Sequence, residues 1–390
     1  MKRFIITNMF LMLLMGTVYS FSVFESSIQS EYQLNTVVSG FPYMFSLFFY
    51  ALMMMLTGRL LNRFSVKGLF ISGAFLWLSG LVLINLSTDF ILFLIGYGVL
   101  LGSGIGVLYG LPLFIVQKTS KHAGFINGII LLGFGLSPLV MAPFANFIVT
   151  TYSLSRFFLI LFGVSTGLFI YLYQLYRPYN IDSRHNALSE GRVKGPFIKL
   201  YFILFLATFA GLMMIGRSHT HSLYYFEGAR FNLSLLISIF AFFNGIARPI
   251  FGQLMDQLGY QKTVFISALI LGLSAVGALF NQGQSIVIYS ITYSAFWLIL
   301  GAHLAIAPQA IKEYYPISQY SKRYGLLFTA YGFAALLSTI LSRILLRTFE
   351  GVSILYYILF GIALLIIILL YTLQGDLKKA KTRKKVLSRL

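Results

Sequence analysis

Charged residues are scarce in this sequence. Only 10% of its 390 residues are Asp, Glu, Lys or Arg, whereas 58% are hydrophobic and the mean hydropathy is +0.84. A soluble globular chain carries about 25% charged residues, so this composition excludes one. Cysteine is absent altogether, which excludes a disulfide framework and thiol chemistry. This amino-acid composition is typical of a polytopic membrane protein.

Acidic residues are the rarer charged class, with ten Asp and Glu in the whole chain. All ten fall in loops or at the ends of the apolar segments. The sequence contains no pair of carboxylates at catalytic spacing, no metal-ligand cluster and no phosphate-binding loop. These absences argue against an enzyme, and we expect neither a cofactor nor a bound metal.

Long apolar runs recur from end to end. Each has about 20 residues, enough to cross about 30 Å of hydrocarbon as a helix. The first run is too long for a typical signal peptide and has no clear cleavage site, so we interpret it as a membrane helix. The sequence predicts an all-α polytopic protein embedded in the lipid bilayer. We count twelve transmembrane helices, at residues 4–24, 37–58, 68–87, 91–116, 123–149, 154–176, 197–216, 232–255, 263–280, 285–310, 324–346 and 352–373.

Basic residues lie mostly on one side of these helices. All but six of the 29 Lys and Arg fall at the N-terminus, in the loops after even-numbered helices or in the C-terminal tail. By the positive-inside rule, both termini are expected in the cytoplasm and the protein in the inner membrane. The net charge of +19 then reflects topology, and no nucleic-acid partner is expected. The six exceptions are Arg248, within a helix, and Arg156, Arg217, Arg230, Arg343 and Arg347 on the opposite side.

The longest polar interruption divides the chain into two halves. It covers residues 177–196 and is rich in charge, Gly and Pro, as expected of a cytoplasmic linker. We predict one six-helix half at 1–176, a second at 197–375 and a basic cytoplasmic tail at 376–390. Paired six-helix halves, with a substrate site between them near the membrane midplane, are typical of one large class of secondary transporter.

A repeated loop supports this division. "GRLLNRFSVK" at 58–67 is echoed by "GQLMDQLGYQK" at 252–262. The repeat resembles the loop motif of the major facilitator superfamily, which implies a twelve-helix major facilitator fold and a cytoplasmic gate that latches the halves together. Asn62 stands where the family has Asp, which weakens the charge in the first copy. The matching residues are Gly58, Asn62, Arg63 and Lys67 in the first half and Gly252 and Asp256 in the second.

A narrower resemblance covers nearly the whole chain. Six segments, in this order and spacing, are similar to the oxalate/formate antiporter family, which is related to the monocarboxylate transporters. The resemblance implies carriage of small organic anions, with the arginine of helix 8 binding a carboxylate. The segments are "GTVYSFSVF" (16–24), "GSGIGVLYGLPLFIVQKTSKHAGFINGIILLGFG" (102–135), "AGLMMIG" (210–216), "NGIARPIFG" (244–252), "GAHLAIAPQAIKEYYP" (301–316) and "YGLLFTAYGFA" (324–334).

The residues themselves point to the same arginine. Arg248 lies eight residues before Asp256, and so about 12 Å into the membrane at 1.5 Å per residue. A charge there costs from a few to more than ten kcal/mol unless it meets water or a partner, and snorkelling or structural pairing is the simpler alternative. No carboxylate is predicted at that depth, so we interpret the substrate as the missing counter-ion. A guanidinium suits this role because it grips a carboxylate through two parallel hydrogen bonds.

Other polar side chains share this depth. Tyr109, His303 and Tyr331 all lie eight or nine residues from a basic residue at the cytoplasmic end of their helices. Asn244 precedes Arg248 by one turn on the same face, and Tyr19 lies in the family-like motif of helix 1. Each residue alone is more often an interhelical hydrogen-bonding residue than a ligand. Together they form the predicted substrate site.

Two departures from relatives refine the hypothesis. Tyr331 stands where oxalate carriers have a second cation, a lysine, which favours a monoanion such as a monocarboxylate, or a dicarboxylate neutralised in part elsewhere. Asn244 stands where proton-linked monocarboxylate transporters have an aspartate, which leaves His303 as the conventional titrating group at this depth. We expect a monomeric secondary transporter that exchanges small carboxylates by alternating access. The sequence leaves open a proton-linked monocarboxylate symporter, a carrier of amino acids or siderophore-like conjugates, and a transporter-like receptor that moves nothing.

Overall fold

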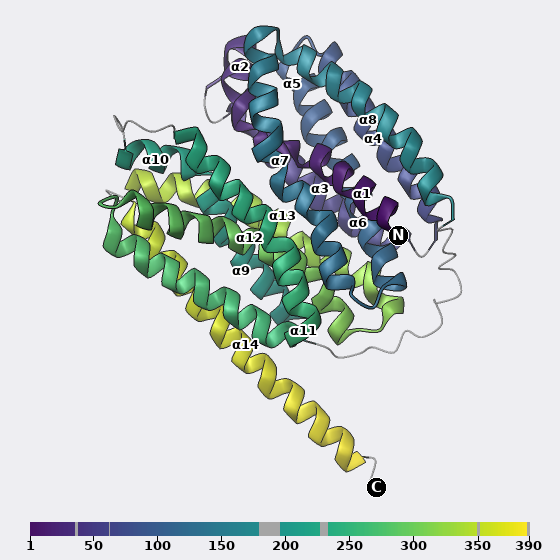
Figure 1. Ribbon diagram of the computed structural model, residues 1–390, viewed down its shortest axis with the longest axis vertical. Helices are drawn as coiled ribbons and strands as arrows, with labels where there is room; N and C mark the ends of the chain where they lie inside the picture. Colours follow the sequence, from purple (N-terminus) through teal and green to yellow (C-terminus); the bar gives the residue numbers. More distant parts are fainter. Residues whose placement is uncertain (36–37, 62, 179–195, 227–232, 349–351, 388–390) are drawn as a thin grey trace.

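The computed structural model describes residues 1–35, 38–61, 63–178, 196–226, 233–348 and 352–387 (Figure 1). These residues form helices joined by turns, and they contain no β-strand. Figure 1 shows two groups of helices, one from each half of the chain. Of the predicted linker 177–196, residues 179–195 lie outside the described part.

The first half of the chain supplies the helices α1 to α8, which pack against one another. Two of its membrane crossings are irregular: α1 continues through the 3₁₀ turn η1 into α2, and α5 continues through the π-helical segment η3 into α6. The bounds are α1 Lys2–Met15, η1 Gly16–Ser20, α2 Ser22–Tyr32, η2 Val38–Gly40, α3 Phe41–Leu60, α4 Val66–Leu86, α5 Phe90–Leu94, η3 Ile95–Leu101, α6 Gly102–Thr119, α7 Ala123–Thr151 and α8 Leu154–Tyr176.

The second half supplies α9 to α14. Its longest helix, α11, is two membrane crossings joined at Gly259, whose φ of 73° and ψ of 177° interrupt the helix. Glycine adopts this positive φ without steric cost. The bounds are α9 Phe197–Ile215, α10 Ser218–Phe226, α11 Leu233–Asn281, α12 Ile286–Tyr314, η5 Ile317–Gln319, α13 Tyr320–Thr348 and α14 Ser353–Leu387.

The number of crossings agrees with the sequence prediction. The described residues contain 11 helical segments long and apolar enough to span a membrane, one of which is the 47-residue segment Leu235–Asn281. A single crossing needs about 20 residues, so this segment, turning at Gly259, accounts for two crossings. The prediction of twelve transmembrane helices and an all-α fold is confirmed.

Polar caps set where several helices begin. The side chains of four loop residues accept hydrogen bonds from backbone N–H groups in the first turn of the helix that follows. Each such cap stabilises a helix by about 1 kcal/mol, and together they fix the short turns between apolar segments. The capping residues are Ser65 before α4, Asp89 before α5, Ser153 before α8 and Ser285 before α12.

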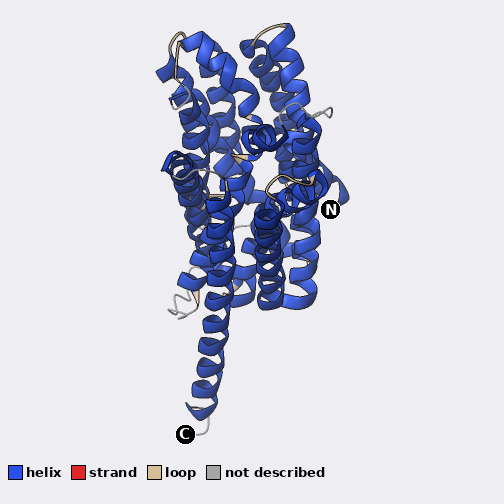
Figure 2. Cartoon of the chain, turned by 90° about the vertical axis from the view of Figure 1, so that its left-hand side faces the viewer, coloured by secondary structure: helices blue, strands red, loops and turns tan. Residues whose placement is uncertain are grey.

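The C-terminal tail continues the last helix. The apolar part of α14 ends at Gly375, whereas the helix itself continues to Leu387. Figures 1 and 2 show this extension projecting beyond the other helices along the long axis of the molecule. The basic tail predicted at 376–390 is therefore helical as far as Leu387.

The two halves meet closely at one end. We call it the basic end, because Lys118, Lys262 and Lys312 lie there. Here α7 packs against α11, and α3 packs against α13. A Cβ added at Gly124 would meet the backbone of Gly252, so only glycine permits the approach of α7 to α11. In this conformation the helices of the two halves are closed against each other at the basic end.

Part of the predicted gate motif makes this contact. The Asp256 carboxylate on α11 accepts hydrogen bonds from the backbone N–H groups of Gly124 (3.0 Å) and Phe125 (2.9 Å). A carboxylate at a helix N-terminus is favoured by the unpaired N–H groups and by the helix dipole. Asp256 of the second half therefore caps α7 of the first half.

The other motif residues are placed differently. Gly58 packs against the backbone carbonyl of Ser321 on α13, again across the two halves. Lys67 lies over the ring of Tyr173 (4.5 Å) within the first half. Arg63 is exposed, and Asn62 lies outside the described residues.

Replacing Asp256 by Ala is expected to loosen the basic end. Two charge-assisted bonds to a helix N-terminus stabilise the closed form by about 1–2 kcal/mol, a factor of about 5–30 in a two-state ratio. The chain has no cysteine, so Thr57→Cys, buried in α3 next to Gly58, provides a unique reporter. Its maleimide labelling rate in detergent should rise in Asp256→Ala.

The control for this experiment is Gln257→Ala, at the exposed neighbouring position. It should leave the labelling rate of Thr57→Cys unchanged. An equal rate in Asp256→Ala and Gln257→Ala would mean that the cap does not hold this end shut.

Candidate functional site

A buried arginine lies between the two halves. Arg248, on α11, has no exposed surface. Its Nη1 donates a hydrogen bond to the backbone carbonyl of Leu131 on α7 (2.9 Å), and its Nη2 donates a longer one to Oδ1 of Asn244 (3.4 Å). The bond to Leu131 crosses from the second half to the first. The guanidinium thus contacts both halves at once.

The charge of Arg248 is not balanced by an acidic side chain. No Asp or Glu of the described ranges makes an ion pair with it, and its Nε has no partner among them. The ring of Phe134 lies 5.5 Å from the guanidinium carbon, within the range of a cation–π contact, which contributes about 0.5–2 kcal/mol. That is small against the cost of a buried charge. The described residues around Arg248 therefore leave its charge without a neutralising partner.

Two tyrosines from opposite halves meet beside the arginine. Tyr19 of η1 and Tyr331 of α13 share a hydrogen bond between their hydroxyls (2.7 Å). The Tyr19 hydroxyl lies next to the Arg248 side chain. Tyr331 is fully buried, whereas Tyr19 keeps some exposure. The sequence predicted that Tyr19 and Tyr331 lie at one site, and the structure places their hydroxyls in contact.

Aromatic rings complete the site. Tyr109 of α6 lies close enough to Arg248 for the guanidinium charge to act on its hydroxyl. Its ring lies 5.6 Å from that of Phe134. Tyr50 of α3 packs against both rings and against Tyr331, with ring-centroid distances of 5.2 Å to Tyr109, 6.0 Å to Phe134 and 5.7 Å to Tyr331. The hydroxyls of Tyr50 and Tyr109 have no hydrogen-bond partner in the described part of the chain.

Sequence reasoning missed Tyr50. Its position carried a usable signal, because Tyr50 precedes the basic residue Arg59 near the end of α3 by nine residues. The count that selected Tyr109 and His303 would have placed Tyr50 at their level. Phe134 was missed because an apolar ring gives no polar signal.

Asn244 and Gly135 set the position of the guanidinium. Asn244 donates from Nδ2 to the backbone carbonyl of Trp297 (3.0 Å), which leaves its Oδ1 directed at Arg248. A Cβ added at Gly135 of α7 would lie 2.6 Å from Cα of Gly245 and 3.0 Å from Nε of Arg248. Any larger residue at 135 would therefore displace either α11 or the arginine.

His303 is not part of this cluster. Its Nε2 is hydrogen bonded to the Ser267 hydroxyl (2.9 Å) within the second half. Gly301, two residues before His303 on α12, packs against the backbone of Asn244 on α11. Two residues correspond to a rotation of about 200° around a helix, so the two positions face different directions. His303 shares the depth of Arg248 but faces another side of α12.

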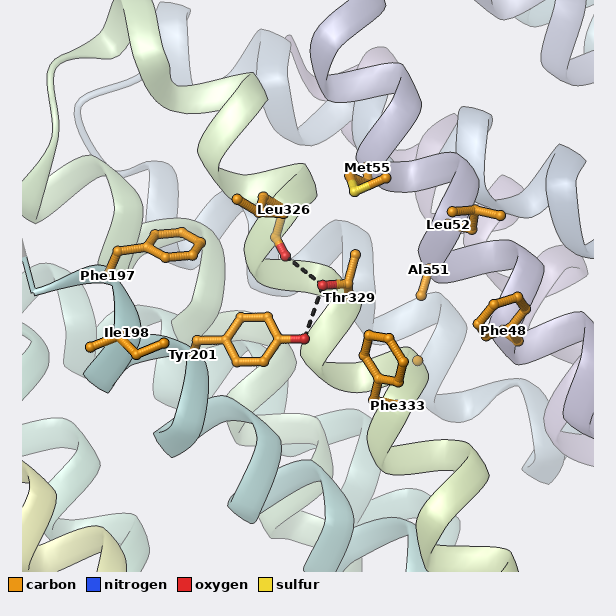
Figure 3. Close-up of a pocket in the computed structure, with 11 residues that line it drawn as sticks. Phe48, Ala51, Leu52, Met55, Phe197, Ile198, Tyr201, Leu326, Thr329 and Phe333 are labelled. Atoms are coloured by element: carbon orange, nitrogen blue, oxygen red, sulfur yellow. Dashed lines mark hydrogen bonds between the residues drawn. The ribbon is translucent and has the colours of Figure 1, made fainter. Parts of the chain in front are cut away.

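A separate crevice lies behind the aromatic cluster. It has a volume of about 450 Å³ and lies between α3, α9 and α13, where Ala51 and Gly332 form part of its wall (Figure 3). Figure 3 shows the Tyr201 hydroxyl directed at Thr329, to which it is hydrogen bonded (3.1 Å). The lining is mostly apolar and has no charged residue, so this crevice offers no cation for an anion.

The sequence matches the model of the Major Facilitator Superfamily over residues 5–300 and 223–389. The chain belongs to this superfamily. It is therefore a multi-pass membrane transporter, and the broader of the two resemblances found in the sequence is confirmed. Arg248 and its aromatic neighbours lie between the two halves of a major facilitator fold.

Individual relatives are more distant. The chain is 20% identical over 336 residues to the uncharacterized MFS-type transporter YhjX of Escherichia coli, covering 83% of this chain and 82% of that protein. It is 24% identical over 248 residues to the oxalate:formate antiporter of Oxalobacter formigenes, covering 59% and 57%. Among solved structures, the superfamily transporter FucP in the outward conformation is similar with a TM-score of 0.73 and 14% identity, covering 95% of this chain and 98% of FucP. This last likeness concerns the fold alone.

Replacing the buried charge should stabilise the empty protein. We expect Arg248→Met to raise the free energy of unfolding by about 1–4 kcal/mol, the range found when buried ion pairs are replaced by well-packed apolar side chains. Scanning fluorimetry in a buffer without organic anions measures this as a higher melting temperature. Arg248→Lys keeps the charge and should not be stabilised.

Arg156→Met is the matched control. Arg156 is exposed and lies over the ring of Tyr152, so its replacement should change stability by no more than about 0.5 kcal/mol. A fall in the melting temperature of Arg248→Met would show that the arginine serves structure rather than an anion.

Proposed function

We propose that this transporter carries small carboxylates by alternating access and binds the substrate carboxylate at Arg248. The observation that carries the proposal is a fully buried guanidinium between the halves, with no acidic partner in the described residues. An always-charged group in this position requires an anion for most of the transport cycle. A carboxylate matches its planar donors.

The neighbouring side chains supply the rest of the binding chemistry. Nε and the unused N–H groups of Arg248 are free for two parallel hydrogen bonds to a carboxylate. The hydroxyls of Tyr19 and Tyr109 are the nearest further donors. The rings of Tyr50, Tyr109 and Phe134 lie within 5.2 to 6.0 Å of one another, which favours a short substrate without a bulky substituent.

We further infer that the basic end faces the cytoplasm. The Lys and Arg distribution supports this orientation through the positive-inside rule. The conformation described above is closed at the basic end, so in this orientation it is closed towards the cytoplasm. The Tyr19–Tyr331 hydrogen bond joins the two halves beside Arg248.

A monoanion suits the charge of the site. Arg248 is the only cation found in the cluster among the described residues, and Tyr331 occupies the position at which oxalate-type relatives carry a lysine. The similarity to the oxalate:formate antiporter of Oxalobacter formigenes supports the carboxylate class. We propose monocarboxylates such as formate or pyruvate as the preferred class, ahead of oxalate.

Exchange is the proposed mode of transport. An empty Arg248 would have to pass through a closed, poorly hydrated intermediate as an unpaired charge, so the return step is easier with an anion bound. Proton coupling through His303 lacks support from its position, because its Nε2 is bonded to Ser267 away from the cluster. Loaded exchange is therefore expected to be faster than net uptake.

Proteoliposomes test the proposal directly. Uptake of radiolabelled formate, pyruvate and oxalate is compared between vesicles loaded with the same anion and empty vesicles, with and without a pH gradient. Uptake of at least one monocarboxylate should be stimulated several-fold by internal anion. Arg248→Ala should raise its KM about 30-fold or more, the effect of losing about 2–5 kcal/mol from a buried charge pair, and Arg248→Lys should recover little of this loss.

His303→Gln is the control in this assay, and it should retain exchange. Full activity in folded Arg248→Ala would overturn the site. Gradient-driven accumulation without stimulation by internal anion, lost in His303→Gln, would show a histidine-linked proton symporter instead. Competition by amino acids or siderophore-like conjugates alone would show a carrier of those solutes instead. No transport of any tested solute would favour a transporter-like receptor.

Tyr331→Lys should change the preferred charge of the substrate. The new ammonium would lie beside Tyr19 and supply a second cation near Arg248. Competition by oxalate relative to formate should therefore increase in exchange assays. Tyr331→Phe, which removes the hydroxyl without adding charge, should leave the oxalate-to-formate ratio unchanged. An unaltered ratio in folded, active Tyr331→Lys would separate Tyr331 from substrate charge selection.

A further inference from the structure

Three buried carboxamides lie near the basic end without partners. Both side-chain polar atoms of Gln117 and of Asn127, and Nε2 of Gln309, make no hydrogen bond within the described residues. Each of these side chains is at least 95% buried. Buried polar groups are normally hydrogen bonded, and an unpaired one is costly. Three such groups in one region indicate that a ligand or water supplies the hydrogen bonds that the described residues do not make.

These residues occupy one level of the membrane. Gln117 lies two residues before the end of α6, Asn127 four residues after the start of α7, and Gln309 five residues before the end of α12. At 1.5 Å per residue, all three lie within about 8 Å of the basic end of their helices. Arg248 lies about 12 Å in by the same measure. We call these three side chains the carboxamide layer.

The helices that carry the layer contact one another in a closed series through α13. The pairs α6 and α7, α7 and α12, α12 and α13, and α13 and α6 are all in contact. They form a ring made from both halves, with Tyr320 and Tyr324 on its fourth member, α13. Tyr320 lies beside Gln117, and the hydroxyls of Tyr320 and Tyr324 are likewise unpaired among described residues.

An aromatic series connects the layer to the arginine site. Ring-centroid distances are 5.5 Å from Tyr109 to Phe328, 5.9 Å from Phe328 to Tyr324, and 5.7 Å from Tyr324 to Tyr320. Tyr324 is also within electrostatic reach of Arg248. Polar groups therefore continue from Arg248 towards the basic end, inside a region that is closed in this conformation.

We propose that the carboxamide layer is a second, weaker carboxylate-binding station on the release path at the basic end. The inference rests on the proposed function. Amide N–H and tyrosine O–H groups donate to a carboxylate but carry no charge, so they hold an anion less tightly than a guanidinium does. When the basic end opens, the anion moves from Arg248 to Gln117, Asn127 and Gln309 and from there into water.

The asymmetry of transport between the two membrane faces tests the station. Exchange of radiolabelled formate, pyruvate and oxalate is measured in right-side-out and inside-out vesicles that carry the full-length protein. Gln117→Met and Asn127→Leu keep side-chain size and remove the donors. The ratio of the KM at the basic face to the KM at the opposite face should rise about 5-fold to 30-fold, the effect of losing one or two hydrogen bonds to a charged group.

Gln253→Met is the matched control, because Gln253 lies near the same end of α11 but is exposed, and its KM ratio should stay at the wild-type value. Gln117→Glu distinguishes a station that binds the anion from a gate whose polar side chains are only hydrated. It keeps size and polarity but adds a negative charge, so basic-face KM should rise more for oxalate than for formate. Equal effects on oxalate and formate, or an unchanged KM ratio in Gln117→Met and Asn127→Leu, overturn the station. Loss of all exchange in the wild type overturns the proposed function itself, and the station with it.

Discussion

The buried guanidinium of Arg248 is the constraint on which the remaining features depend. It is fully buried, and the described residues offer it a backbone carbonyl, a carboxamide oxygen and a ring face, but no carboxylate. These partners hold the guanidinium in place without neutralising it. In the proposed function this unfavourable arrangement has a use, because a neutralised arginine would have no affinity left for an anion.

The same helix pair carries both the site and the closed end. Along α7 and α11, the Leu131 carbonyl meets Arg248, the Gly128 position packs against the backbone of Arg248, and the N–H groups of Gly124 and Phe125 meet Asp256. Packed helices move as rigid bodies rather than deforming continuously. Opening the basic end must therefore change the contacts of Arg248 with α7, which links occupancy of the site to the state of the gate.

The sequence was sufficient for the fold and for the depth of Arg248 in its helix, and less so for the residues that surround it. Twelve apolar runs predicted the helices because each run is long enough to cross the membrane alone. Depth along a helix also follows from counting residues, and it brought Arg248, Tyr109 and Tyr331 to one level. Depth does not give the direction of a side chain around the helix: His303 has the right level and faces Ser267 instead. Partners contributed by backbone or apolar rings, such as Leu131 and Phe134, carry no sequence signal of charge.

Competition at the guanidinium provides a physical basis for alternating access. Nη1 of Arg248 donates across the halves to Leu131, and a carboxylate is a stronger acceptor than a neutral carbonyl. In the proposed function, an arriving anion draws donors away from the first half and brings its own oxygen atoms within reach of tyrosines on both halves. Binding would then replace one contact between the halves by several contacts through the substrate. Because a ligand shifts a conformational equilibrium only through differential affinity, this exchange of contacts at Arg248 would supply the free energy that moves the helices.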